Sequence, residues 1–174
     1  RQQLTLASGG VVQCARFSPH DDAVLAGGAA DGTVAVWRTD APLSSSMDTT
    51  HEKSVCALSF SPTNPLLLAS ASTDKHILFF DIKQQKNVRS INCAFPLSSM
   101  AFKRDGYFVA VGTSTGSVLL YDLRGGDAPV SRSVAHAPFG CASIAFAAED
   151  VVAQAVIRST RASPAITALT SNTR

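Results

Sequence analysis

The stretch from Val55 to Asp81 reads VCALSFSPTNPLLLASASTDKHILFFD, and it decides the fold. Three short apolar runs lie within it, at Val55–Phe60, Leu66–Ala69 and Ile77–Phe80. Ser-Pro and Thr-Asn-Pro separate the first two runs, and Thr-Asp-Lys separates the last two. Such residues favour turns, and apolar runs of this length between turns are typical of short strands. The stretch therefore predicts a small unit of strands joined by tight turns.

The same pattern recurs along the chain at a nearly constant interval. The phenylalanines that end the first strand of each unit are 43, 42 and 44 residues apart: Phe17, Phe60, Phe102 and Phe146. A second aromatic series keeps this interval, with spacings of 43 and 41: Trp37, Phe80 and Tyr121. A unit of this size cannot bury both faces of its own sheet, so stacked neighbours must complete the core.

A period of about 40–45 residues, with an aromatic residue and Asp ending the third strand, is the signature of WD40 repeats. Two units end in Phe80-Asp81 and Tyr121-Asp122, whereas Trp37 is followed by Arg38. The resemblance implies an all-β fold: a partial WD40 β-propeller of about three blades plus a closing strand, with a flexible C-terminal tail. Trp37, Phe80 and Tyr121 would be the aromatic anchors of the blades. The expected blades span about 8–48, 51–92 and 93–132, the closing strand 136–146 and the tail or linker 147–174.

From Thr50 to Phe146 the chain is similar to one WD-repeat family, the proteins that target the γ-tubulin ring complex to centrosomes and spindles. The segments that carry this resemblance occur in the same order: His51–Lys53, Phe60–Asn64, Thr73–Asp81, Pro96–Phe102 and Tyr121–Arg124. The resemblance implies a non-enzymatic scaffold for microtubule nucleation, without cofactors. Its partners would be the γ-tubulin complex and centrosomal or spindle proteins, and its location cytoplasmic, at the centrosome and spindle.

Three blades and one strand are too few to close a propeller ring, because closed propellers usually have 4–8 blades. We therefore expect the missing propeller half, or a second copy of the chain, to complete it. After Phe146 the aromatic pattern stops. Composition permits a short helix around 148–157 and favours a mobile linker from Arg158. In the resembled family a flexible region here leads to a helical segment that contacts the γ-tubulin complex.

One group of residues could be mistaken for a hydrolase triad: His51, Asp74 and either Ser70 or Ser72. We interpret it as the structural hydrogen-bond network of a WD40 blade, in which the fourth member is normally tryptophan. Phe80 stands at that place and has no polar atom, so the network has at most three members. His136 lies at the corresponding place two repeats further on and is interpreted in the same structural way.

Composition argues against several other classes of function. With 45% hydrophobic and 16% charged residues the chain can bury a core, and its net charge of +2 does not favour nucleic-acid binding. No apolar run reaches the roughly 18 residues of a membrane helix. The four cysteines form no CxxC pair and are read as reduced thiols, and no histidine pair has metal-ligand spacing.

The sequence Tyr121-Asp122-Leu123-Arg124 supports an alternative function. WD40 substrate receptors of cullin-RING ubiquitin ligases carry Trp-Asp-x-Arg at this place, and its Arg contacts the ligase adaptor. Arg124 is thus a candidate partner contact, unless it only pairs with Asp122 or Asp127. A generic WD40 scaffold is the remaining alternative.

Overall fold

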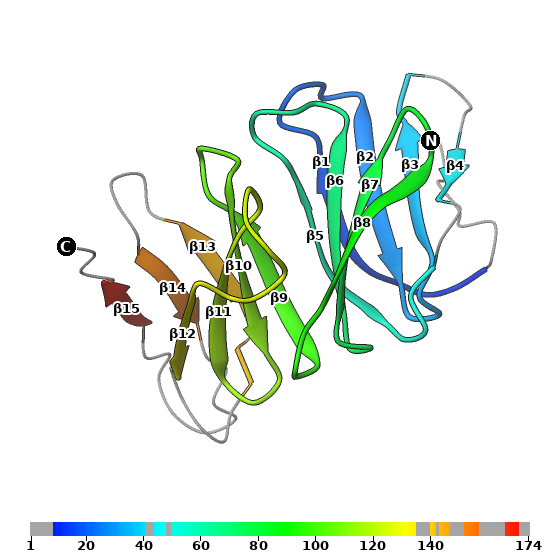
Figure 1. The fold of residues 1–174 in the computed structure, drawn as a ribbon. Coiled ribbons are helices and arrows are strands. Elements are labelled where there is room, and N and C mark those ends of the chain that lie inside the picture. Colours follow the sequence, from blue (N-terminus) through cyan, green and yellow to red (C-terminus); the bar gives the residue numbers. More distant parts are fainter. Residues whose placement is uncertain are drawn as a thin grey trace.

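The computed structural model describes residues 9–40, 44–47, 50–134, 140–141, 143–146, 152–156 and 166–170. Every regular element in these segments is a β-strand, and the strands form four antiparallel sheets (Figure 1). The predicted all-β fold is confirmed.

Each of the first three sheets contains four strands that follow one another in chain order. The first sheet holds β1 (Val12–Phe17), β2 (Val24–Ala29), β3 (Val34–Arg38) and β4 (Ser44–Ser46). The second holds β5 (Val55–Phe60), β6 (Leu67–Ser72), β7 (His76–Asp81) and β8 (Lys86–Asn92). The third holds β9 (Leu97–Phe102), β10 (Phe108–Thr113), β11 (Ser117–Asp122) and β12 (Ser131–Val134).

The fourth sheet contains three described strands, β13 (Ser143–Phe146), β14 (Val152–Val156) and β15 (Ile166–Thr170). A helix around 148–157 is therefore wrong where the structure describes this segment, because 152–156 is a strand paired with β13 and β15. Val152 and Val156 are β-branched, which favours a strand over a helix. Ile144 pairs with Ala155 in this sheet, so the expected closing strand has partners of its own.

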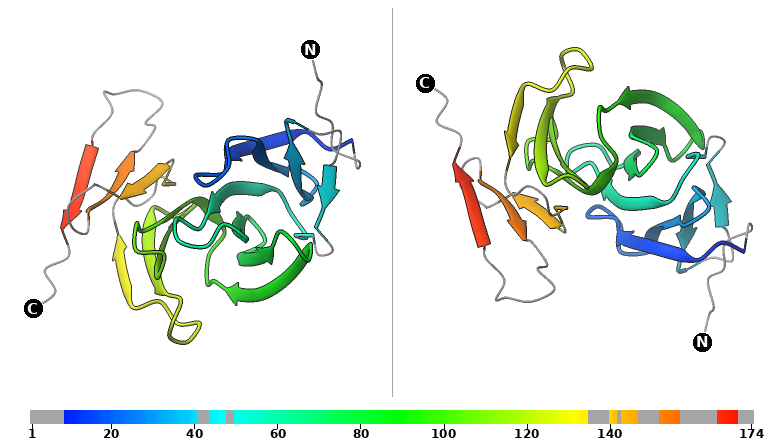
Figure 2. Two further views of the ribbon diagram at one scale, coloured as in Figure 1. Left: turned by 90° about the horizontal axis from the view of Figure 1, so that it is seen from above. Right: turned by 90° about the horizontal axis from the view of Figure 1, so that it is seen from below.

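The four sheets stand side by side in chain order, as the blades of a propeller do (Figure 2). Their first strands β1, β5, β9 and β13 lie innermost, and each contacts the next one in the series. Each of β1, β5 and β9 carries a register shift close to its start. Such bulges increase the twist of a strand, which suits the innermost position in a blade.

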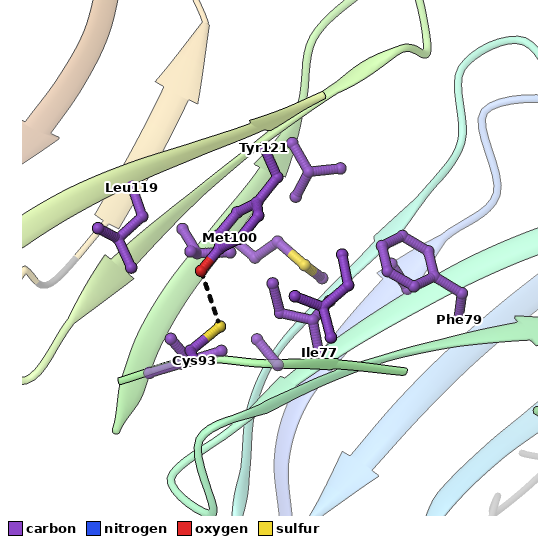
Figure 3. Packing of buried hydrophobic residues seen from close by; sticks show 12 residues of the cluster. Ile77, Phe79, Cys93, Met100, Leu119 and Tyr121 are labelled. Carbon is purple, nitrogen blue, oxygen red and sulfur yellow. Dashed lines mark hydrogen bonds between the residues drawn. The ribbon is translucent and has the colours of Figure 1, made fainter. Parts of the chain in front are cut away.

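The core lies between neighbouring sheets. Between the second and third sheets, side chains from β6, β7, β9, β10 and β11 form one buried cluster (Figure 3). Within it, Phe79 packs edge-on against Phe102, with ring centroids 6.5 Å apart. The Tyr121 hydroxyl donates a hydrogen bond to the Cys93 sulfur at 3.2 Å, so the buried phenol has a partner. A similar cluster, which includes Phe80 and Leu68, fills the space between the first and second sheets.

The structure buries all three aromatic residues of the repeat, at equivalent places on β3, β7 and β11. Phe80 lies in the cluster between the first and second sheets, and Tyr121 in the cluster between the second and third. Trp37 is 4% exposed and packs with Ala29 and Ala35 of the first sheet. The Trp37 ring covers Gly27, where an added Cβ would overlap the indole. Phe80 and Tyr121 thus fill the space between their own sheet and the preceding one.

Candidate functional site

His51 is held between two side chains of the second sheet. Its Nδ1 lies 2.9 Å from Oδ2 of Asp74, and its Nε2 lies 2.7 Å from Oγ of Ser70. Ser70 stands in the middle of β6, and Asp74 lies in the tight turn to β7. The chain reaches His51 just before β5, where the His51 N–H donates to the Gly32 carbonyl of the first sheet. The network therefore joins the start of one blade to the middle of the same blade and to its neighbour.

The protonation state of His51 follows from its partners. Burial lowers the pKa of His51, against the opposing charge of Asp74, so the ring is neutral at pH 7. A carboxylate only accepts hydrogen bonds, so Nδ1 carries the proton and donates it to Asp74. The bare Nε2 then accepts the hydroxyl proton of Ser70.

Asp74 organises the turn as well as the histidine. Its carboxylate accepts the N–H groups of Glu52 at 3.0 Å and His76 at 2.8 Å. Burial alone would raise the pKa of Asp74, but these backbone bonds and the contact with His51 outweigh it, and the pKa is lowered. The carboxylate is therefore ionised at neutral pH and is satisfied by three donors.

Ser72 has a different role from Ser70. Its hydroxyl donates to the carbonyl oxygens of Ser54 at 2.8 Å and Lys53 at 3.1 Å, and accepts the Asp74 N–H at 3.1 Å. Of the two candidate serines, Ser70 is therefore the one in contact with His51, while Ser72 fixes the strand ends around the turn.

The distances within this group match those of a catalytic Ser–His–Asp triad. The group differs from a catalytic triad in its solvent access, because it is buried. Ser70 is 0% exposed, and the side chains of His51 and Asp74 are 0% and 4% exposed. A catalytic serine must reach a substrate carbonyl beside an oxyanion hole. The Ser70 hydroxyl instead lies inside the packed sheet. Phe80, also 0% exposed, occupies the place of the fourth member and adds apolar packing only.

Arg124 lies on the surface after β11 and is largely engaged. Its Nε and Nη2 donate to the two oxygens of Asp122 at 3.0 and 2.8 Å, and its guanidinium stacks over the Tyr107 ring at 4.8 Å. These bonds lower the pKa of Asp122 to about 2. Of the two carboxylates considered, Asp122 is the partner of Arg124. Asp127 pairs instead with Arg89, which lies on β8 of the second sheet.

One set of contacts was not foreseen. At the bulge of each of β1, β5 and β9, a short side chain donates to a backbone carbonyl at the start of the next innermost strand or just before it. Cys14 donates to Val55 at 3.7 Å, Cys56 to Leu97 at 3.2 Å, and Ser98 to Cys141 at 2.6 Å. The three donors are each 42 residues apart, and this spacing is the signal that sequence reasoning could have used.

All four cysteines are free thiols. Burial raises the pKa of Cys14 to about 11 and that of Cys56 to about 12, so both thiols stay protonated. In the described part of the chain no three His, Cys, Asp or Glu side chains gather in a way that could hold a metal ion. Among the same residues no helix has the length and apolarity to cross a membrane. His136 lies outside the described residues.

Curated relatives and a solved structure resemble this chain. Protein NEDD1 of Mus musculus is 31% identical over 122 residues, and NEDD1 of Homo sapiens is 30% identical over 123. Each match covers 70% of this chain and 18% of the relative, so the chain corresponds to less than a fifth of those proteins. A chain in the solved structure titled "Crystal Structure of Mitotic Checkpoint Complex" superposes with a TM-score of 0.75. It is 21% identical, covers 86% of this chain and 45% of the solved one, and therefore supports the fold alone.

The resemblance to a WD40 protein of the NEDD1 kind is thereby confirmed, and such propellers are protein-interaction scaffolds. A family model described as "Nucleolar protein 10-like, N-terminal domain", a β-propeller, matches residues 1–165, which is nearly the whole chain. The chain therefore belongs to the nucleolar protein 10-like, N-terminal β-propeller family.

Proposed function

We propose that this chain is a non-catalytic scaffold that helps to target the γ-tubulin ring complex to the centrosome and spindle. The observation that carries the proposal is the similarity to NEDD1, a γ-tubulin ring targeting factor, at about 30% identity over 70% of the chain. The stack of sheets supports it, because a rigid propeller presents loops and edges to protein partners while its own polar network is buried.

The proposal that the chain is not an enzyme rests on the burial of the His51 network. The side chains of Ser70 and His51 have no exposed surface from which to attack a substrate. We propose a structural role for His51, Ser70, Ser72 and Asp74, in which they hold the entry of β5 against the turn between β6 and β7. Partners would meet the loops and strand edges.

Affinity purification tests the γ-tubulin proposal. The epitope-tagged product of the complete gene that encodes this chain is recovered from mitotic cells and probed for γ-tubulin, with an unrelated WD40 propeller as the matched control. Recovery of γ-tubulin with that product and not with the control is the expected result. Recovery equal to that of the control would contradict the proposal. Association with nucleolar proteins instead would favour a function closer to the description of the family model.

The cullin-RING receptor remains the second candidate, because Arg124 is more than half exposed at the end of β11. A ligase adaptor would have to compete with Asp122 for the guanidinium. A pull-down with the ligase adaptor tests it: adaptor binding by the wild-type chain that disappears in Arg124→Ala would support this candidate. No adaptor binding by the wild-type chain would remove it.

A further inference from the structure

The innermost strands line an open cavity of about 490 Å³ whose side chains take no part in the His51 network. All four sheets contribute to its wall, through Arg16 of β1, Leu58 of β5, Phe102 of β9 and Phe146 of β13. Arg104, just after β9, stands at its border. A volume of this size lies within the range of pockets that bind a ligand or a few side chains of a partner.

The charges in this cavity are of one sign. Its lining residues include Arg16 and Arg104 and no Asp or Glu. Neither arginine forms an ion pair with any residue that the structure describes. By contrast, Arg38, Arg89 and Arg124 each form an ion pair with an Asp side chain. Both cavity arginines are thus available to a carboxylate from outside.

An apolar extension adjoins the two arginines. A second cavity of about 270 Å³ shares Arg16, Ser59 and Phe102 with the first, so the two adjoin, and we treat them together as one groove. Phe17 borders the second cavity and is 59% exposed, an unusual exposure for a large aromatic side chain. A ligand that fits this groove would carry negative charge beside an apolar or aromatic group.

We propose that this groove, the Arg16–Arg104 groove, docks a short acidic segment of a protein partner that also carries an apolar side chain. The carboxylates would take hydrogen bonds from the two guanidinium groups, and the apolar side chain would pack against Phe17 and Phe102. The inference rests on the proposed scaffold function, because it names the chemistry of a partner segment. Two cations in a mainly apolar wall, on a chain of net charge +2, fit a peptide better than a nucleic-acid backbone.

A synthetic peptide tests this docking site. The probe is a fluorescein-labelled hexapeptide with two Asp residues on each side of Leu-Phe, titrated with the 174-residue chain and followed by fluorescence anisotropy. The control peptide carries Lys in place of each Asp. We expect the acidic peptide to bind, the basic one not to bind, and the affinity to fall as salt is raised.

Variants then locate the binding. The double variant Arg16→Gln/Arg104→Gln is expected to bind the acidic peptide about tenfold more weakly, because it loses two charge-assisted contacts. Phe17→Ser is expected to weaken binding through the loss of apolar contact. Arg132→Gln is the matched control: Arg132 lies over Phe95, outside the groove, and its loss should leave affinity unchanged. Arg16→Lys/Arg104→Lys keeps the charge and should give an intermediate affinity.

Several results would overturn the proposal. One is no binding of the acidic peptide, and another is equal binding by the wild-type chain and by the Gln double variant with an unchanged melting temperature. Tighter binding of an eight-nucleotide oligothymidine than of the acidic peptide would assign the groove to nucleic acid instead. Because the probe is a synthetic peptide, its failure leaves the γ-tubulin purification unaffected, and failure of that purification leaves the peptide titration interpretable.

Discussion

Replacement of Asp74 by Ala is the sharpest test of the structural role proposed for the His51 network. The change removes the acceptor of three hydrogen bonds, from the His51 ring and from the N–H groups of Glu52 and His76. The His51 side chain is 0% exposed, so water cannot replace the lost partner, and an orphaned buried donor costs about 1–3 kcal/mol. The two backbone N–H groups lie closer to solvent and add about 0.5–1 kcal/mol each.

These terms sum to about 3 kcal/mol of unfolding free energy for Asp74→Ala. For a chain of this size, that corresponds to a melting temperature lower by about 6–12 °C. Differential scanning calorimetry measures the shift, with Asp127→Ala as the matched control, because Asp127 is 62% exposed and pairs on the surface. The control should stay within about 2 °C of the wild type. Equal melting temperatures for Asp74→Ala and the wild type would refute the reasoning.

The remaining predictions concern titration, packing and reactivity. Because folding lowers the pKa of His51, the neutral ring stabilises the fold fully above the unfolded pKa of 6.5, and this stability is lost as the pH falls below that value. The lowered pKa of Asp74 adds a further loss of stability under more acidic conditions. The melting temperature should therefore fall between pH 7.5 and 5.5 by scanning fluorimetry, and fall less in His51→Asn; an equal fall would contradict this. Tyr121→Phe loses the hydrogen bond to Cys93 and should reduce the unfolding free energy by about 1 kcal/mol in urea titrations. An unchanged unfolding free energy would show that this bond does not contribute to stability. Cys14 should react with iodoacetamide at pH 8 about 100-fold more slowly in the native chain than in guanidinium, because burial raises its pKa to about 11. Equal rates would show that the thiol is not protected.

The repeat made most of the fold predictable. The spacing of Phe17, Phe60 and Phe102 places each first strand, and the structure has β1, β5 and β9 ending at these residues. Such regularity survives in the sequence because every blade must bury the same face. After Phe146 the aromatic signal ends, and composition alone could not distinguish a helix or linker from the strands β14 and β15.

The polar network was predictable only in part. The residue types indicated a bond between His51 and Asp74, but two serines lay within reach. Ser70 and Ser72 are two residues apart on β6 and therefore point to the same face of the sheet, so the sequence alone leaves them equivalent. Only the position of His51 along β6 decides that Ser70, and not Ser72, meets the ring, at 2.7 Å. The Arg16–Arg104 groove was not predictable, because its residues come from four separate repeats.

Localisation of the chain in dividing cells tests the central claim most directly. The 174-residue chain, fused to a fluorescent protein, is imaged in mitotic cells beside a γ-tubulin marker, with the fluorescent protein alone as control. Targeting to γ-tubulin sites predicts enrichment at the spindle poles and along the spindle. A diffuse signal like that of the control, or a signal confined to nucleoli in interphase and absent from the spindle, would contradict it.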